Sequence, residues 1–119
     1  MSHSREIGKQ YEDMAVDYLK NHGYQILARN YQVRQGEIDI IARDDQYLIF
    51  IEVKYRKNAK SGDPAEAVSF KKQQAISNTA LYFLNQKRYP TDTPVRFDVI
   101  TILDETLTHI KDAFCFVRK

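Results

Sequence analysis

The sequence has one cysteine in 119 residues, a formal net charge of only +2 and no long apolar run. A single cysteine excludes an internal disulfide, and the apolar neighbours of Cys115 predict that it is buried as a small hydrophobic side chain. The longest unbroken apolar runs, such as Tyr47 to Ile51, are far shorter than the roughly 20 residues that span a bilayer, which excludes a membrane helix. The start of the chain alternates charged and polar residues and lacks the apolar stretch of a secretory signal, so we expect a cytoplasmic protein.

No internal repeat, low-complexity segment or linker rich in proline, glycine or serine divides the chain, so residues 1–119 are expected to form one domain. Folding at this size hides about two thirds of the accessible surface, and a core can form without disulfides or metals. The 18 basic and 16 acidic residues nearly cancel, yet the stretch from Lys54 to Lys60 holds four cations and no acid. This basic run, which includes Tyr55, can follow a phosphate backbone, although a solvated loop is the simpler alternative.

Hydrophobic periodicity and turn residues predict the element order α-β-β-β-α-β-β. Asp63 is a candidate N-cap for the second helix, with a proline and a capping-box glutamate after it, and the pattern allows a break near Ser69. A mobile loop is expected near residues 57–63. The predicted helices cover residues 6–21 and 63–86, and the predicted strands cover residues 24–31, 37–43, 47–56, 95–103 and 107–117.

A tight polar turn between the second and third strands sets their register. If the turn consists of residues 45 and 46, paired residue numbers sum to 91, which places Asp39 opposite Glu52 and Glu37 opposite Lys54. Paired Cβ atoms lie roughly 4.5 to 5.5 Å apart, and like charges opposed across a ladder are destabilising. Alternation along the third strand also puts Glu52 and Lys54 at the end of an otherwise apolar face. A bound divalent cation would remove the conflict between the two carboxylates.

Each predicted helix adds one charged residue to this region. Glu12 falls at the edge of the apolar stripe of the first helix, from which it can reach the sheet. Lys72 lies within the apolar stripe of the second helix, where a lysine requires an explanation. A site above the core supplies one.

Carboxylates that converge beside a lysine meet the demands of metal-assisted phosphodiester hydrolysis, because Mg²⁺ and Mn²⁺ prefer oxygen ligands. Asp39 and Glu52 would bind the ion, together with the carbonyl of Val53. Lys54 would orient the attacking water or stabilise charge on the phosphate oxygens. Glu12 would be a further ligand or an acid that holds a metal-bound water. Two residues of the second helix are candidates for phosphate contacts, namely Lys72 and Gln73.

Each candidate also has a purely structural interpretation. Glu52 and Lys54 can be a same-face ion pair at a sheet edge, and Asp39 can be a solvated strand end. Glu12 can be an ordinary surface residue of its helix, and Lys72 can extend its ammonium group from an amphipathic helix into water.

Two further polar residues lie on the last two predicted strands. Asp98 shares a strand face with Arg96, which favours a structural ion pair or loop anchor over a metal ligand. His109 has no partner at metal-ligand spacing and is interpreted as an ordinary strand residue.

Several stretches together resemble the uncharacterised bacterial YraN family over nearly the whole chain: Gly36 to Ala42, Ile49 to Arg56, Lys72 to Gln73, Arg96 to Val99 and Ile110 to Phe114. That family is similar to archaeal Holliday-junction resolvases and other restriction-endonuclease-like nucleases, whose catalytic signature is PD-(D/E)xK. The resemblance places Asp39, Glu52 and Lys54 on the two acids and the lysine of that signature, with Ile38 where its name implies proline. It also places Glu12 on the helical glutamate of the resolvases. Lys72 and Gln73 match a lysine and a glutamine in the helix after the catalytic strand.

These observations lead to the expectation of an α/β domain of the restriction-endonuclease-like (tRNA endonuclease-like) type, with a central mixed sheet flanked by helices. The expected activity is cleavage of branched or otherwise structured DNA with Mg²⁺ or Mn²⁺, with Arg56 and Lys57 of the basic run touching the DNA. A domain this small offers little surface for coordinated cutting of two strands, which favours a homodimer. The alternatives are a non-catalytic nucleic-acid-binding module on the same fold and a protein-interaction domain with a tyrosine-rich surface.

Overall fold

The computed structural model describes residues 3–56 and 68–117, with side chains from residue 8 onward. The order of elements is the predicted one, and no helix of these residues is long and apolar enough to cross a membrane. The helices are α1 (His3–Asn21) and α2 (Phe70–Gln86), and the strands are β1 (Gln25–Val33), β2 (Gly36–Arg43), β3 (Leu48–Arg56), β4 (Val95–Leu103) and β5 (Thr106–Phe114).

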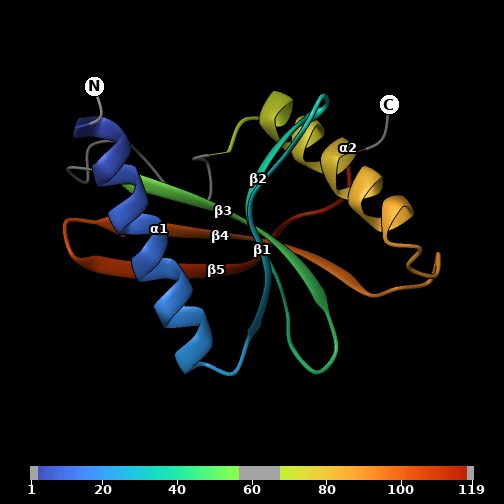
Figure 1. Ribbon diagram of the computed structural model, residues 1–119, viewed down its shortest axis with the longest axis horizontal. Coiled ribbons are helices and arrows are strands. Elements are labelled where there is room, and N and C mark those ends of the chain that lie inside the picture. The colour runs from blue at the N-terminus through green and yellow to red at the C-terminus, as the bar shows by residue number, and fades with distance from the viewer. Residues whose placement is uncertain (1–2, 57–67, 118–119) are drawn as a thin grey trace.

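The five strands form one mixed sheet in the order β1-β2-β3-β4-β5, in which only β3 and β4 are parallel. The connection between these two parallel strands includes α2. Ile49 and Ile51 of β3 pack in one core cluster with α1, whereas Leu48 and Phe50 pack in another with α2. The two helices therefore cover opposite faces of the sheet, which runs between them in Figure 1. The mixed α/β class with helices flanking a central sheet is confirmed.

The turn between β2 and β3 has the predicted length. The Asp44 backbone N–H donates to the Tyr47 carbonyl at 3.1 Å, which leaves two residues in the loop. The Asp44 carboxylate accepts from the backbone N–H groups of Gln46 at 2.9 Å and Tyr47 at 2.7 Å, so the aspartate fixes the turn from inside. The resulting register pairs Ile40 with Ile51, which confirms the predicted sum of 91.

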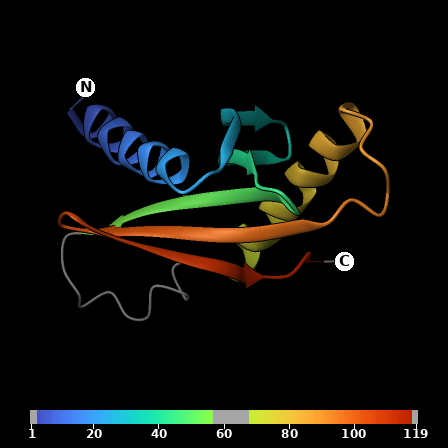
Figure 2. The same ribbon diagram turned by 90° about the horizontal axis from the view of Figure 1, so that it is seen from below.

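Strand β2 leaves β3 at Asp39. The described pairs of these two strands end at Ile40 and Ile51, while β2 continues its pairing with β1. Ile38 packs in the α2 cluster and Ile40 in the α1 cluster, so the strand changes face between them. In Figure 2 the β1–β2 ribbon rises from the plane of the other three strands. The predicted opposition of Glu37 and Lys54 is therefore wrong, because the two strands have separated before those positions.

Two backbone features hold the β1–β2 ribbon in its bent course. Asn30 has a φ of +51° and lies between the pairs that β1 makes with Ile38 and Ile40 of β2; asparagine tolerates this left-handed conformation better than most residues. Gly36, at the tip of the ribbon, lies against α2. A Cβ atom at this position would be 3.0 Å from the Thr79 hydroxyl oxygen, so the close contact requires glycine.

Helix α2 begins at Phe70, where the Ser69 hydroxyl accepts from the Lys72 backbone N–H at 3.1 Å as an N-cap. Residues 68 and 69 are therefore not helical, so the helix does not run unbroken through residues 63–86. The predicted N-cap Asp63 and the predicted mobile loop at 57–63 lie outside the described residues.

The prediction that Cys115 is buried is wrong, because its side chain is exposed. The residue follows the end of β5, an edge strand with a single neighbour. Phe114 and Phe116 on either side pack against the α2 cluster. With both neighbours turned inward, the cysteine between them faces outward.

Candidate functional site

Asp39 and Glu52 lie where β2 and β3 separate. These two acids are the next residues along the strands beyond the last described pair of the ladder, Ile40 and Ile51, and Glu52 is near enough for its charge to raise the pKa of the Asp39 carboxyl. The Asp39 Oδ2 atom accepts a hydrogen bond of 2.8 Å from the Val53 backbone N–H. Asp39 is half-buried and Glu52 is 6% exposed, so both acids are largely shielded from water.

The environment of Asp39 disfavours its charge. Burial, and then the charge of Glu52, raise the pKa of the Asp39 carboxyl from its ordinary value of 3.8 to about 7, although the hydrogen bond from Val53 opposes the rise. Smaller contributions come from Glu37 and Glu12. Near neutral pH both the protonated and the ionised form of the Asp39 carboxyl are therefore populated.

Glu52 lies on the face of β3 that α2 covers, between two lysines. The Nζ atoms of Lys54 and Lys72 are each 3.6 Å from its Oε2 atom. Lys54 follows two residues later on the same strand, as alternation predicts, and Lys72 comes from the first turns of α2. The structure thus brings together the predicted acid and both predicted lysines.

Glu12 lies on the side of the sheet that α1 covers, where it is held by two residues of β1. Its Oε1 atom accepts from Arg29 Nε at 3.1 Å, Arg29 Nη2 at 2.9 Å and Asn30 Nδ2 at 3.0 Å. Arg29 also pairs with Asp13 of α1. The sequence analysis missed these partners, because neighbours on β1 carry no spacing signal toward a helix 17 residues earlier in the chain.

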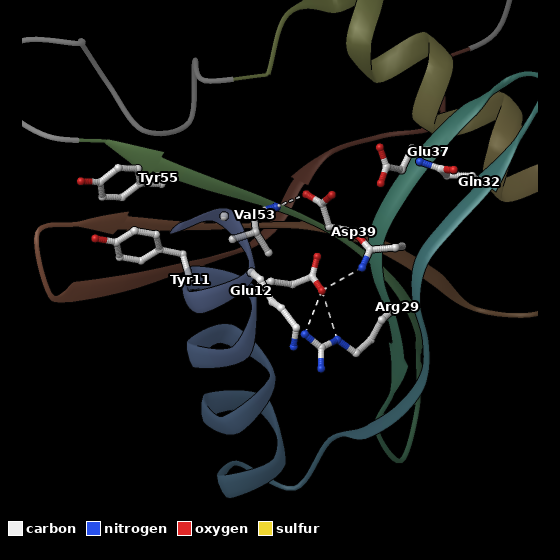
Figure 3. Close-up of a pocket in the computed structure, with 11 residues that line it drawn as sticks. Tyr11, Glu12, Arg29, Gln32, Glu37, Asp39, Val53 and Tyr55 are labelled. Atoms are coloured by element: carbon white, nitrogen blue, oxygen red, sulfur yellow. Dashed lines mark hydrogen bonds and ion pairs between the residues drawn. The ribbon is translucent and has the colours of Figure 1, made fainter. Parts of the chain in front are cut away.

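A cavity of about 690 Å³ opens beside Asp39 on the α1 side of the sheet. Figure 3 shows the carboxylates of Glu12 and Asp39 at its centre and the rings of Tyr11 and Tyr55 together at one side. The two tyrosine rings are stacked, with centroids 3.9 Å apart and an angle of 14° between their planes. The cavity is therefore polar at its base and aromatic at one wall.

Within the described part of the chain, no three acidic, histidine or cysteine side chains lie close enough together to hold a metal ion. Each of the three predicted acids instead has its own partners: Glu12 has Arg29, Glu52 has two lysines, and Asp39 has the Val53 backbone N–H.

The predicted substrate contacts have mixed outcomes in the structure. Arg56 is the half-buried last residue of β3, and Lys57 lies outside the described residues. Gln73 donates from Nε2 to the Val68 carbonyl at 3.0 Å, which ties its side chain to the start of α2. Of the predicted α2 contacts, only Lys72 directs its charge toward Glu52.

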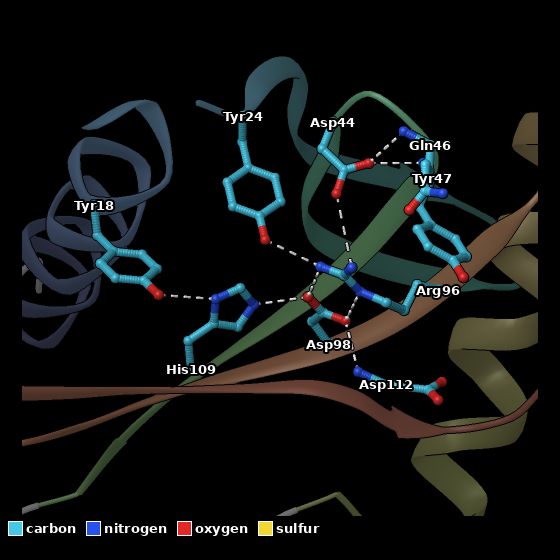
Figure 4. Close-up of polar contacts among 9 residues, drawn as sticks. All are labelled: Tyr18, Tyr24, Asp44, Gln46, Tyr47, Arg96, Asp98, His109 and Asp112. Carbon is cyan, nitrogen blue, oxygen red and sulfur yellow. Dashed lines mark hydrogen bonds and ion pairs between the residues drawn. The ribbon is translucent and has the colours of Figure 1, made fainter. Parts of the chain in front are cut away.

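Asp98 lies outside this site and anchors a bulge of β5. Figure 4 shows its contacts with Arg96, His109 and Asp112. It is fully buried and accepts from Arg96 Nε and Nη2, each at 2.9 Å, and from the Asp112 backbone N–H at 2.9 Å. Burial alone would raise the pKa of Asp98, but hydrogen bonds from His109 and Arg96 keep it below its ordinary value. The interpretation of Asp98 as a structural ion pair and loop anchor is confirmed.

His109 is more than an ordinary strand residue. Its Nε2 atom lies 2.7 Å from the Asp98 carboxylate, and its Nδ1 atom lies 3.0 Å from the Tyr18 hydroxyl. The neutral tautomer with hydrogen on Nε2 satisfies both contacts. This connection between α1, β4 and β5 could not be read from the sequence, because the tyrosine and the histidine are 91 residues apart.

Comparison with known proteins places the chain among relatives along nearly its full length. A model of the family described as uncharacterised protein family UPF0102 matches residues 11–102. A UPF0102 protein of Lachnoclostridium phytofermentans is 54% identical over 103 residues, which cover 87% of each chain. One of Thermodesulfovibrio yellowstonii is 45% identical over 109 residues, covering 92% of this chain and 96% of the relative. One of Clostridioides difficile is 44% identical over 113 residues, covering 93% of this chain and 98% of the relative.

Asp39→Asn should stabilise the protein in a pH-dependent manner. The folded-state pKa of about 7 lies above the ordinary 3.8, so the ionised carboxylate costs stability as pH rises between these values. The variant should match the wild type near pH 4 and exceed it above pH 7, by about 4 kcal/mol at most. Urea unfolding of both proteins across this range measures the difference. A difference that does not change with pH would contradict the raised pKa.

Asp98→Ala should destabilise the fold by about 3 to 5 kcal/mol, because it removes the closest carboxylate partner of the largely buried Arg96 guanidinium and leaves the Asp112 N–H without its acceptor. Asp17→Ala is the matched control, since this aspartate is exposed on α1, and we expect a change within about 0.5 kcal/mol. Chemical unfolding measures both. Equal effects in the two variants would show that the buried network contributes nothing specific.

Proposed function

This chain belongs to the uncharacterised protein family UPF0102, and we propose that it is a metal-dependent endonuclease that hydrolyses phosphodiester bonds of branched or otherwise structured DNA. The observation that carries the proposal is the position of two shielded carboxylates, Asp39 and Glu52, just past the last β2–β3 pair: the charge of Glu52 acts on Asp39, and two lysines are directed at Glu52. We further propose that the mixed sheet flanked by two helices is of the restriction-endonuclease-like type. The acid, acid and lysine of that signature would be Asp39, Glu52 and Lys54.

The donors at the point of strand separation suit Mg²⁺ or Mn²⁺. Both acids offer hard oxygen ligands, and one oxygen of Asp39 already points to the Val53 backbone, whose carbonyl would be a third donor. A divalent cation favours the ionised form of a carboxyl, so it would offset the burial that raises the pKa of Asp39. The ion would supply Lewis-acid activation of the phosphate.

Glu12 has a supporting role in this proposal. The sequence leaves open whether this acid binds the ion directly or holds a neighbouring water. Because Arg29 and Asn30 already engage its Oε1 atom, we assign it the second role. Arg29, by pairing with Glu12, would hold that carboxylate in place.

The two lysines would act on the phosphate. Lys54 and Lys72 approach Glu52 from a strand and a helix, and their side chains are 36% and 43% exposed. Their ammonium groups therefore reach solvent beside the candidate cation position. There they can stabilise the charge that develops on phosphate oxygens during the reaction, and Lys54 can also orient the attacking water.

Cleavage assays with labelled linear, flapped, nicked and four-way DNA, in Mg²⁺, Mn²⁺ or EDTA, test the proposal. We expect cleavage with metal only, and a loss of about 100-fold or more in Glu52→Gln and in Lys54→Ala. Lys20→Ala, at an exposed position near the end of α1, should cut as the wild type does.

Cleavage that survives Lys54→Ala would be the work of a contaminating nuclease. Binding of these DNAs without cleavage in either metal would replace the nuclease with the non-catalytic binding module. If none of the DNAs binds at low salt, where phosphate contacts are strongest, a protein-interaction domain becomes the better explanation.

Calorimetric titration with Mn²⁺ tests the cation position separately. Asp39→Ala should weaken binding by about tenfold or more, because it removes one of the two carboxylate ligands. Wild-type affinity should rise as pH increases through about 7, since a proton and the cation compete for Asp39. Equal affinity of the two proteins for Mn²⁺ would exclude Asp39 as a ligand.

A further inference from the structure

The cavity beside Asp39 contains an aromatic wall that the proposed chemistry does not use. Tyr11 of α1 and Tyr55 of β3 stack there at 3.9 Å between ring centroids. Tyr55 is 37% exposed, so part of the stacked pair remains open to a ligand. The cavity volume of about 690 Å³ falls in the range of about 300 to 1,000 Å³ that is typical of small-molecule sites.

The charges of this cavity do not favour a phosphate. Its two cations already have acidic partners: Arg29 pairs with Glu12 at 2.9 Å, and Lys9 lies 3.7 Å from Asp13. The carboxylates of Glu12, Glu37 and Asp39 also line it, and because Glu37 takes no part in the proposed cation site, its charge would still repel an anion there. An uncharged, planar ligand with hydrogen-bond donors fits this wall and these acceptors better.

Polar groups that could recognise such a ligand by hydrogen bonds lie apart from the two tyrosines. Gln32 and Glu37 are partners across the β1–β2 ladder, and Figure 3 shows their side chains together, apart from the two rings. The Gln32 amide can donate and accept, and the Glu37 carboxylate accepts. A flat ring system that stacks on Tyr55 would thus direct its edge toward hydrogen-bonding groups.

We propose that this cavity binds an unpaired nucleobase of the DNA substrate, stacked on the Tyr11–Tyr55 pair. The inference rests on the proposed nuclease function and narrows its substrate class to DNA with unpaired nucleotides beside the cut, such as flaps, gaps and open junctions. Phosphates would lie on the α2 side with Lys54 and Lys72, the base would enter on the α1 side, and Asp39 lies between the two. A base in intact duplex is stacked and paired, so it cannot enter.

A 2-aminopurine probe tests this in the Glu52→Gln background, which prevents cutting. The probe is placed at an unpaired position of a flapped DNA or at a paired position of the matching duplex. Fluorescence of the probe and anisotropy of a distant label are then measured on addition of protein. The fluorescence should change on binding only for the flapped DNA, which should bind about tenfold more tightly than the duplex.

Substitutions identify the residues responsible. Tyr55→Ala should remove the tenfold preference and the fluorescence change without altering duplex binding, and Tyr55→Phe should retain both. Tyr82→Ala is the matched control, because this tyrosine is similarly exposed, at 41%, on α2. Gln32→Ala removes an exposed side chain and should also weaken binding of the flapped DNA alone, so it provides the test if Tyr55→Ala does not fold.

Equal binding of flapped and duplex DNA, or a preference unchanged by both Tyr55→Ala and Gln32→Ala, would overturn the base site. These outcomes are distinct from failure of the nuclease. If the wild type never cuts but the tyrosine-dependent preference is present, the base site stands without hydrolysis. If the wild type cuts duplex and flapped DNA equally well in all the tyrosine variants, the nuclease stands without the base site.

Discussion

The hydrogen bond from the Val53 backbone N–H to the Asp39 carboxylate is the contact on which the site depends. A strand that leaves its neighbour exposes backbone donors and acceptors that the ladder no longer pairs. Here a side-chain oxygen satisfies the N–H of β3 just after the ladder ends at Ile40 and Ile51. Because this side-chain hydrogen bond takes the place of a ladder bond, β2 can bend toward α2. The same bond holds a carboxylate in place between the two strands. The same geometry that divides the sheet therefore creates the site.

Two aspartates of this sheet show how burial and hydrogen bonding compete. Asp98 is fully buried, yet it accepts from Arg96, His109 and the Asp112 backbone, and its pKa is lowered. Asp39 accepts from one backbone N–H, has Glu52 nearby, and its pKa is raised to about 7. The first charge is fully compensated and needs no ligand. An uncompensated carboxyl in a cavity is the kind of group on which a functional site is built.

The sequence could predict those features that depend on local chemistry. The turn residues around Asp44 set the β2–β3 register, and alternation then placed Glu52 and Lys54 on one face, as the structure has them. Features that depend on contacts between distant parts of the chain could not be predicted from the sequence. The hydrogen bonds from Arg29 to Glu12 and between Tyr18 and His109 join helices and strands that are distant in the sequence. Residue spacing along the chain does not predict that these elements come into contact. The predicted opposition of Glu37 and Lys54 is wrong for a related reason, because extending the hairpin register assumes that the two strands stay paired.

The bend of β2 also explains why both faces of the sheet can contribute to one site. In a flat sheet, Glu52 on the α2 side and Glu12 on the α1 side would be separated by the strands. Where β2 and β3 separate, Asp39 lies close enough to both acids for their charges to raise its pKa. A phosphate held by the lysines on one side and a base held by the tyrosines on the other would then belong to neighbouring nucleotides of one DNA strand. To follow this path from one face of the sheet to the other, the DNA strand must separate from its complementary strand.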